Sequence, residues 1–262
     1  MLTTRLCKLL GIEFPIFSAP IGPDLTGPDL VASVSGAGGL GLMQAQLSSP
    51  PDFREQIRRV RSATDKPFGV NFILALPHEE NLQVSLEEHV PIISFFWGDP
   101  APYVKWIHAA GSKILLQTGT VKAAQRAAAA GVDVIIAQGT EAGGHVEGET
   151  STMVLTPRVV DSVAPVPVIA AGGIVDARGL VAVLALGAQG AALGTLFLAT
   201  REANVHPLYQ QNYLARLRPI RCAQFYSVTD GPMPLIVRCE PALSSNGFAT
   251  KRVSRSRVPT NP

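Results

Sequence analysis

The chain has 262 residues, of which 47% are hydrophobic and 16% are charged, and its formal net charge is +2. One large core can be buried at this size, because α/β barrels reach about 250 residues as a single domain. The 24 glycines and 21 prolines follow no period, which excludes a collagen-like chain. Cys7, Cys222 and Cys239 lack the spacing of a zinc site or a disulfide framework, so we expect no metal and a reducing, cytoplasmic location.

Short apolar runs recur along the chain, and each is followed by a glycine-rich or polar junction. The runs are PIFSAP (15–20), GLGLM (39–43), FGVNF (68–72), IISFFW (92–97), KILLQT (113–118), VDVIIAQ (132–138), PVIAAG (167–172) and AALGTLFL (191–198). Runs of this length between turn signals are typical of buried parallel strands. The sequence therefore predicts eight strands.

Helix signals lie between these runs. Thr26 to Pro28 places a proline near a helix start, and Ser49, Thr120 and Asp176 are expected N-caps. Gly131 ends the alanine-rich stretch that follows Thr120. Strands that alternate with helices predict a parallel sheet, and eight such units predict a closed (β/α)8 TIM barrel over residues 1–216.

Two stretches permit other interpretations. GAGGLG (36–41) matches a dinucleotide-binding pattern, but it precedes an expected strand, whereas that fingerprint follows one, so an open doubly wound sheet is disfavoured. Residues 179–199 carry no charge and are long enough for a membrane span. The N-cap Asp176 and the interruption by Gly187 favour a helix followed by a buried strand, and no signal peptide or membrane association is expected.

Catalytic residues of a barrel lie at the carboxyl ends of its strands. The junctions after the runs hold APIG (19–22), Asn71, Gln138 to His145, Gly172–Gly173 and Gly194–Thr195. The last two follow the seventh and eighth runs, where barrels commonly bind a phosphate on backbone N–H groups. The same glycines would equally serve to make tight turns, and the pattern alone does not decide between the two.

Five segments of the chain resemble one known family. They are QGTEAGGHVEG, FGVNF, FFWGDP, VIAAGGI and GAALGTLFLAT. That family is the nitronate monooxygenase family, formerly called 2-nitropropane dioxygenases. The resemblance extends from residue 5 to about residue 215 and implies an FMN-dependent (β/α)8 barrel. The QGTEAGGH stretch is also similar to FMN-dependent enoyl-acyl-carrier-protein reductases. It therefore indicates the cofactor better than the substrate.

The resemblance implies a role for each matching position. His145 would be the catalytic histidine, and Asn71, Gln138 and Gly143 would contact the flavin. The phosphate would lie against Gly173, Ala192, Leu193, Gly194 and Thr195, and Ala19, Pro20 and Ile21 would line the flavin pocket. Elementary chemistry agrees with these roles, because amides can both donate to and accept from a flavin ring, and imidazole can accept a proton near neutral pH. His78, His89, His108 and His206 are expected to be surface or packing residues.

The implied reaction is the oxidation of an alkyl nitronate by O2 to a carbonyl compound and nitrite. His145 would remove the α-proton of a neutral nitroalkane or hydrogen-bond an anionic nitronate. Two alternatives remain open. One is an NAD(P)H-dependent flavin reductase with a quinone or enoyl-thioester substrate, and the other is an inactive flavin-binding protein.

The family pattern stops near residue 217. Residues 217–262 contain seven Lys and Arg but only two Asp and Glu, a net charge of +5. This basic tail could bind nucleic acid, but we expect no nucleic-acid partner, because a coding frameshift explains the same segment. Residues translated out of frame have not been selected to pack, so we expect the tail to be disordered.

The frameshift can be tested on the gene. Allowed codons for Asp230 to Ile236, read from the third base, encode WPDAPH, which resembles the segment that the family has at this place. We predict that sequencing the coding region will show codons compatible with that peptide. Codons that cannot encode WPDAPH in the shifted frame would contradict the hypothesis.

Overall fold

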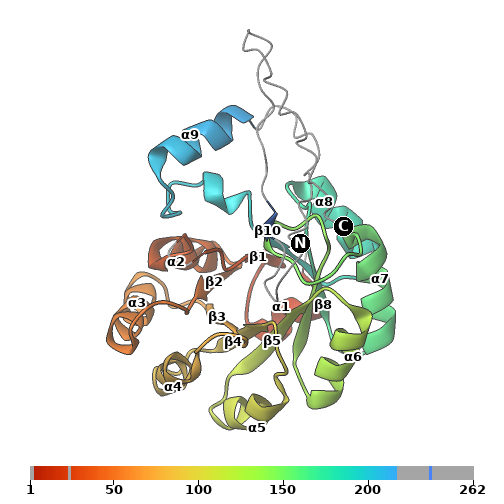
Figure 1. Cartoon of the computed structure of the whole chain (residues 1–262), viewed down its shortest axis with the longest axis horizontal. Coiled ribbons are helices and arrows are strands. Elements are labelled where there is room, and N and C mark those ends of the chain that lie inside the picture. The colour runs from red at the N-terminus through yellow and green to blue at the C-terminus, as the bar shows by residue number, and fades with distance from the viewer. Residues whose placement is uncertain (1–2, 23–24, 217–235, 238–262) are drawn as a thin grey trace, which may run out of the picture.

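The computed structural model describes residues 3–22, 25–216 and 236–237, and it shows a closed barrel of parallel strands surrounded by helices (Figure 1). The barrel strands are β1 (Ile16–Ser18), β2 (Leu40–Gln44), β3 (Gly69–Ile73), β4 (Ile92–Phe96), β5 (Lys113–Thr118), β6 (Val134–Gln138), β8 (Val168–Ala171) and β9 (Gly190–Leu193). Each strand pairs with the next, and β1 closes the ring on β9, where Phe17 lies opposite Ala192. The predicted (β/α)8 barrel is confirmed.

Helices connect the strands and form an outer layer. They are α1 (Arg5–Leu10), α2 (Pro28–Gly36), α3 (Pro50–Ala63), α4 (Glu79–Glu87), α5 (Ala101–Ala109), α6 (Val121–Ala130), α7 (Thr152–Val163), α8 (Ala177–Ala185), the 3-10 helix η1 (Phe197–Ala199) and α9 (Pro207–Arg216). Two short strands, β7 (Gly144–His145) and β10 (Ile236–Val237), pair antiparallel outside the barrel.

The helix signals in the sequence are found where they were expected. The side chains of Ser49, Thr120 and Asp176 each accept a hydrogen bond from a backbone N–H in the first turn of the helix that follows. Such N-caps contribute about 1 kcal/mol each. Gly131 ends α6 in the left-handed conformation, with φ of 97°.

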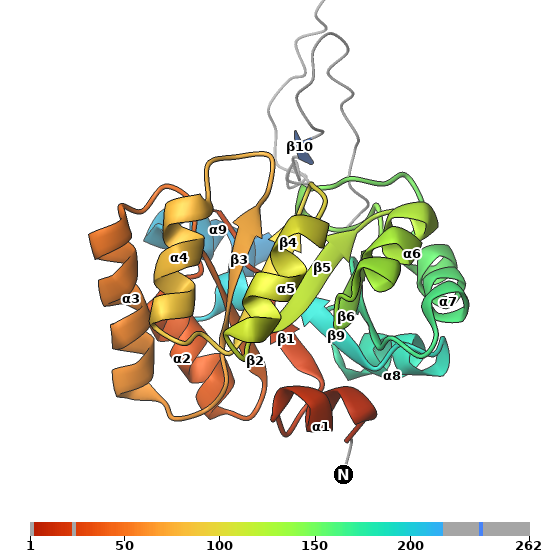
Figure 2. The same cartoon turned by 90° about the horizontal axis from the view of Figure 1, so that it is seen from below.

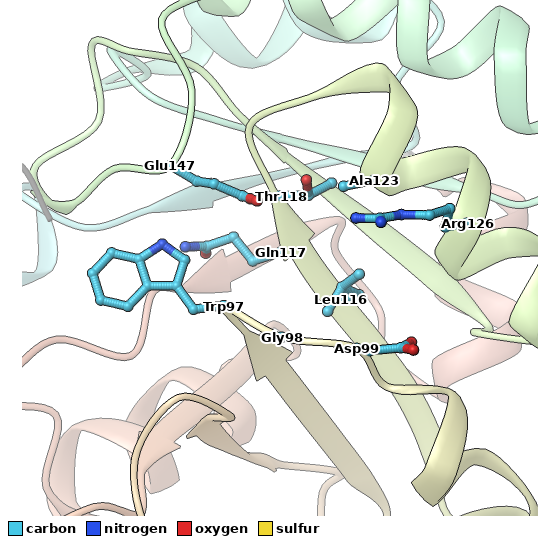
Figure 3. A pocket seen from close by; sticks show the side chains of 9 residues that line it. All are labelled: Trp97, Gly98, Asp99, Leu116, Gln117, Thr118, Ala123, Arg126 and Glu147. Carbon is cyan, nitrogen blue, oxygen red and sulfur yellow. The ribbon is translucent and has the colours of Figure 1, made fainter. Parts of the chain in front are cut away.

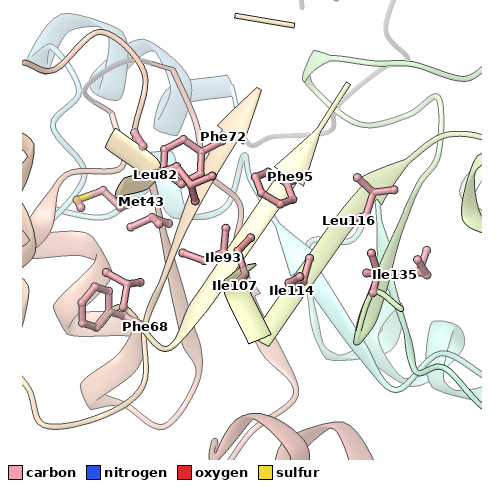
Figure 4. Packing of buried hydrophobic residues seen from close by; sticks show 14 of the residues in the cluster. Met43, Phe68, Phe72, Leu82, Ile93, Phe95, Ile107, Ile114, Leu116 and Ile135 are labelled. Atoms are coloured by element: carbon pink, nitrogen blue, oxygen red, sulfur yellow. The ribbon is translucent and has the colours of Figure 1, made fainter. Parts of the chain in front are cut away.

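The core has two layers. The outer layer lies between the strands and the helices, and Figure 4 shows its aromatic and aliphatic side chains. Phe72 of β3 contacts Phe53 of α3 and Phe95 of β4, with ring centroids 6.3 and 6.2 Å away. Each buried side chain of this size contributes roughly 1.5–3 kcal/mol, so this layer fixes the helices on the barrel.

The inner layer fills the barrel and is closed at one end by α1. Leu6 and Leu10 of this helix belong to the same buried cluster as Leu115 and Ile136 of the strands. Figure 2 shows α1 beneath the barrel, at the end opposite β10. The backbone N–H of Leu6 also donates to the side chain of Gln189, 3.0 Å away. The amino-terminal end of the barrel is thus closed, and the carboxyl end is the one available for a site.

The uncharged stretch 179–199 contains most of α8 followed by β9, as the helix-and-strand interpretation predicted. No helix within the described ranges is long and apolar enough to cross a membrane. The expected eighth strand, 191–198, was too long. β9 ends at Leu193, because the N–H of Phe197 turns back to the carbonyl of Gly194 and begins a 3-10 helix.

The expected disorder of the tail concerns residues 217–262, which lie outside the described residues except for Ile236 and Val237. These two form β10, where Ile236 lies opposite His145 and Val237 opposite Gly144. The tail therefore reaches the loop that follows β6 with at least one backbone segment.

A close contact between α2 and β2 gives a test of the barrel. A Cβ atom on Gly41 would lie 2.3 Å from the carbonyl oxygen of Val31, which real contacts do not allow. We predict that Gly41→Ala lowers the free energy of unfolding by at least about 3 kcal/mol in urea denaturation, because backbone must move. The control is Gly36→Ala on α2, where the nearest atom is 3.7 Å away. Equal stability of both variants would contradict this packing.

Candidate active site

The strand order brings several predicted site residues to one rim of the barrel. Asn71 of β3 is in register with Gln44 of β2, near the carboxyl ends of both strands. Gln138, the last residue of β6, lies opposite Ala171 of β8, which in turn lies opposite Ala192 of β9. Residues that are far apart in the sequence therefore surround one opening.

The pairing of β1 with β9 places the predicted pocket segment 19–21 beside the predicted phosphate-binding turn at Gly194 and Thr195. The N–H of Ala19 donates to the carbonyl of Leu193 over 2.9 Å. A Cβ atom on Gly194 would lie 3.6 Å from Ile21 and 3.7 Å from Ala19. Pro20 lies between these two residues, so the segment 19–21 borders the turn that follows β9.

Two turns on this rim form a possible anion cradle. Gly173 follows β8 with φ of 68°, a conformation that favours glycine. A Cβ atom on Gly143 would lie 3.9 Å from the hydroxyl of Thr195. Among the described residues, the N–H groups of Gly173, Gly194 and Thr195 have no backbone acceptor. Free N–H groups in neighbouring turns, with a hydroxyl beside them, suit a phosphate.

A chain of amide side chains fixes Asn71. Its Nδ2 donates to Gln44 Oε1 over 2.8 Å, and Gln44 in turn donates to Gln46. Asn71 is only 4% exposed, so its orientation is constrained from all sides. Because Nδ2 has a partner, the amide oxygen of Asn71 is the atom left to accept a hydrogen bond from a ligand.

Gln138 carries an unsatisfied polar atom. Its Nε2 donates to the carbonyl of His145 over 2.9 Å, whereas its Oε1 is buried without a partner among the described residues. An unpaired buried acceptor costs about 1–3 kcal/mol. A ligand with an N–H or O–H group at this place would remove that cost, so Gln138 fits the edge of a bound flavin or its ribityl chain.

His145 lies on β7 against an aromatic side chain. The centroids of its imidazole and of the Trp97 indole are 4.7 Å apart, and the planes are tilted by 58°. Trp97 follows β4 directly and also stacks on Phe96, at 4.6 Å. Its φ of 51° is unusual for a large side chain and directs the indole toward the histidine loop.

The protonation state of His145 follows from this environment. The residue is exposed, yet neighbouring protein atoms desolvate the ring and thereby lower the pKa of its imidazole. Neither ring nitrogen has a hydrogen-bond partner among the described residues. The lowered pKa favours the neutral imidazole at pH 7, the form in which one ring nitrogen can accept a proton.

Two glutamates anchor the loop that carries His145. Glu141 Oε2 accepts from both the N–H and the hydroxyl of Thr152, at 2.8 and 3.0 Å, at the start of α7. Glu147 Oε2 accepts from the N–H of Gly119, which follows β5, over 3.0 Å. The loop is thus held on both sides of the histidine.

Sequence reasoning missed the roles of Trp97 and Glu147. The position of Trp97 directly after a strand was the signal that could have placed it on the rim. Glu147 gives no such signal, because its partner Gly119 is 28 positions away. His78 was correctly expected to be a packing residue, since it is buried against Tyr103.

Comparison with known proteins assigns the chain to a family. The model of the family described as nitronate monooxygenase matches residues 3–82 and 72–220. The chain belongs to the nitronate monooxygenase family. Members of this family are oxidoreductases, and they are flavoproteins, which agrees with the unpaired amide oxygen of Gln138 on the rim.

Individual relatives carry different names. A nitronate monooxygenase of Paraburkholderia phytofirmans is 35% identical over 257 residues, which cover 80% of this chain and 70% of the relative. The (3aS,4S,5R,7aS)-5-hydroxy-7a-methyl-1-oxo-octahydro-1H-indene-4-carboxyl-CoA dehydrogenase of Rhodococcus jostii is 38% identical over 218 residues. That match covers 82% of this chain, and the chain spans 60% of the length of this relative.

A solved structure gives the same picture. FabK from Thermotoga maritima is 40% identical, with a TM-score of 0.79, and the match covers 85% of this chain and 70% of that protein. Relatives with 35% and 38% sequence identity to this chain are named for different reactions. The family is therefore established, whereas the specific reaction of this chain has to be argued from its own residues.

The loop anchor gives a second test. We predict that Glu141→Ala lowers the free energy of unfolding by about 1 kcal/mol, because the N–H of Thr152 loses its acceptor, while the exposed position of Glu141 lets water screen the interaction and the Thr152 hydroxyl keeps its bonds to Ala171 and Gly172. Urea denaturation measures the change. Glu149→Ala, in the same loop, is the control and should stay within about 0.5 kcal/mol of the wild type. A larger loss in the control would show that the effect does not come from the Thr152 contacts.

Proposed function

We propose that the chain binds FMN at the carboxyl end of the barrel and catalyses the oxidation of alkyl nitronates by O2 to carbonyl compounds and nitrite. The observation that carries this proposal is the His145 imidazole, which has a lowered pKa, makes no side-chain hydrogen bond within the described residues and packs on Trp97. The family match supports the same reaction.

The residues present fit a flavin mononucleotide. Backbone N–H groups of Gly173, Gly194 and Thr195 would bind its phosphate, and the side chains of Asn71 and Gln138 would bind its ring and ribityl groups. The bound flavin supplies the two-electron redox chemistry and the reaction with oxygen. The remaining tasks of binding, orientation and proton transfer belong to the protein.

His145 has two roles that depend on the substrate. For a neutral nitroalkane, its unprotonated ring nitrogen accepts the α-proton, and the carbanion charge spreads onto the nitro oxygens. For a nitronate that is already an anion, its N–H donates a hydrogen bond to a nitro oxygen. The anchors at Glu141 and Glu147 hold the imidazole in place for either task.

A second function is favoured by one observation. The Rhodococcus relative, at 38% identity, is named for a substrate that is a CoA thioester. In that case the flavin would exchange electrons with a thioester or with NAD(P)H, and His145 would transfer a proton at the carbon next to the carbonyl. Rapid reduction of the flavin by NAD(P)H, with none by a nitronate, would support this alternative.

The decisive measurement is the visible absorption spectrum of the purified protein under anaerobic conditions. We predict a flavin spectrum that bleaches when an alkyl nitronate is added and recovers when O2 is admitted. A protein that retains no colour after incubation with FMN would contradict the proposal. A coloured protein that neither a nitronate nor NAD(P)H bleaches would instead support an inactive flavin-binding protein.

The pH dependence tests the role of His145. Its pKa is lowered in the folded protein, so the base stays neutral until the pH falls below the ordinary imidazole value of about 6.5. We predict that kcat/KM for a neutral nitroalkane decreases as the pH falls through that lowered pKa, because protonation removes the base.

The substitution His145→Asn should reduce kcat/KM for the neutral nitroalkane by about 10²–10⁴ and remove this acidic limb. Activity with a preformed nitronate should fall less, because no proton has to be removed. His89→Asn is the matched control, since His89 lies in the exposed turn between α4 and β4 and its φ of 52° suits asparagine. An acidic limb that persists in His145→Asn would assign the base to another group.

A further inference from the structure

A cavity lies beside His145, on the side of the rim formed by β4, β5 and α6. It measures about 270 Å³ and is lined by Trp97, Gly98, Asp99, Leu116, Gln117, Thr118, Ala123, Arg126 and Glu147 (Figure 3). Trp97 belongs to both places, because its indole contacts the imidazole and also forms one wall of the cavity. A group bound beside His145 can therefore extend around Trp97 into this space.

The cavity contains several hydrogen-bond donors that have no partner. Among the described residues, the side chains of Trp97, Gln117 and Arg126 make no hydrogen bond or ion pair. Figure 3 shows the indole nitrogen of Trp97 directed toward Gln117, and the guanidinium of Arg126 directed into the same space. Unpaired donors of this kind select a ligand that carries acceptor oxygens.

The carboxylates of the cavity are partly in use. One oxygen of Glu147 accepts from the N–H of Gly119, and one oxygen of Asp99 accepts from the N–H of Ala101. Within the described residues, the second oxygen of each carboxylate and the amide oxygen of Gln117 have no partner, so the cavity suits a group that can both donate and accept. The two negative charges of the carboxylates outnumber the single positive charge of Arg126, so the lining carries a net charge of −1. This balance disfavours a carboxylate or phosphate and favours a neutral oxygen group, such as a hydroxyl or an amide carbonyl.

The backbone of Trp97 supports a functional origin for this arrangement. Its φ of 51° lies in the left-handed region, which costs a large side chain on the order of 1–3 kcal/mol. A glycine, which lacks a Cβ atom, would remove that cost. The strained conformation places the indole between the imidazole and the cavity. The reacting carbon of a substrate can then lie on the imidazole side of the indole, and its substituent on the cavity side.

We propose that this cavity is a subsite for the distal part of the substrate, and that the preferred substrates are short nitronates with a neutral hydroxyl or amide group on the carbon chain. The proposal rests on the proposed function, because it places the reacting carbon beside His145. Gln117, Arg126 and Trp97 determine the specificity. A volume of about 270 Å³ accommodates a substituent of several heavy atoms.

A matched pair of substrates tests the subsite. The nitronates of 3-nitropropan-1-ol and 1-nitrobutane have the same length and differ in a terminal hydroxyl or methyl group. We predict that kcat/KM of the wild type is about tenfold higher for the hydroxyl compound, since its oxygen can replace the water on these donors, whereas a methyl group would displace that water without accepting a hydrogen bond. In Gln117→Leu and in Arg126→Met, this ratio should fall below about threefold.

The control is Lys122→Met, one turn before Arg126 on α6, which should keep the tenfold ratio. Arg126 and Lys122 are both exposed, so neither substitution is expected to disturb folding. Equal kcat/KM for the two nitronates in the wild type would overturn the proposal. A ratio that stays near tenfold in both Gln117→Leu and Arg126→Met would overturn it as well.

A binding measurement separates this proposal from the proposed function. The chain has two tryptophans, so Trp106→Phe leaves Trp97 as the only indole. In this variant, 3-nitropropan-1-ol should quench the fluorescence with a Kd about tenfold lower than that of 1-nitrobutane. This preference without any nitronate turnover would support the subsite and refute the proposed reaction. Turnover of nitronates without a binding preference would support the proposed reaction and refute the subsite.

Discussion

The parallel pairing of β1 with β9 is the interaction on which the rest of the structure depends. Phe17 lies opposite Ala192, and this register closes the barrel across a separation of more than 170 residues. Closure leaves no free strand edge and brings Ala19 to the turn at Gly194. The contact of the segment 19–21 with the cradle therefore exists only in the closed barrel, because the two come from opposite ends of the described domain.

Much of this arrangement was predictable from the sequence, because it rests on local chemistry. N-caps such as Ser49 and Asp176, the C-cap Gly131 and the apolar strand runs each act within a few residues. The end of β9 was not predictable in the same way. AALGTLFL is apolar throughout, and only the turn at Gly194 separates the strand from the 3-10 helix.

The candidate site shows the same division. Position after a strand indicated Asn71, Gln138 and His145, although their roles stay predictions. The contacts that set their chemistry join distant segments, as in the hydrogen bond between Glu147 and the N–H of Gly119. The left-handed backbone of Trp97 could not be read from the sequence either, because tertiary packing imposes it against the preference of the residue.

The two sides of the rim differ in how far they can distinguish substrates. Under the proposed function, the N–H groups of Gly173 and Gly194 and the amides of Asn71 and Gln138 would recognise features that all flavin phosphates share. Relatives named for a nitronate and for a CoA thioester can therefore have this side in common. Selection among substrates has to come from side chains that reach past the imidazole. In this chain those side chains belong to the wall formed by β4, β5 and α6. There the backbone of Trp97 is strained, and the donors of Gln117 and Arg126 have no partner in the described part of the chain.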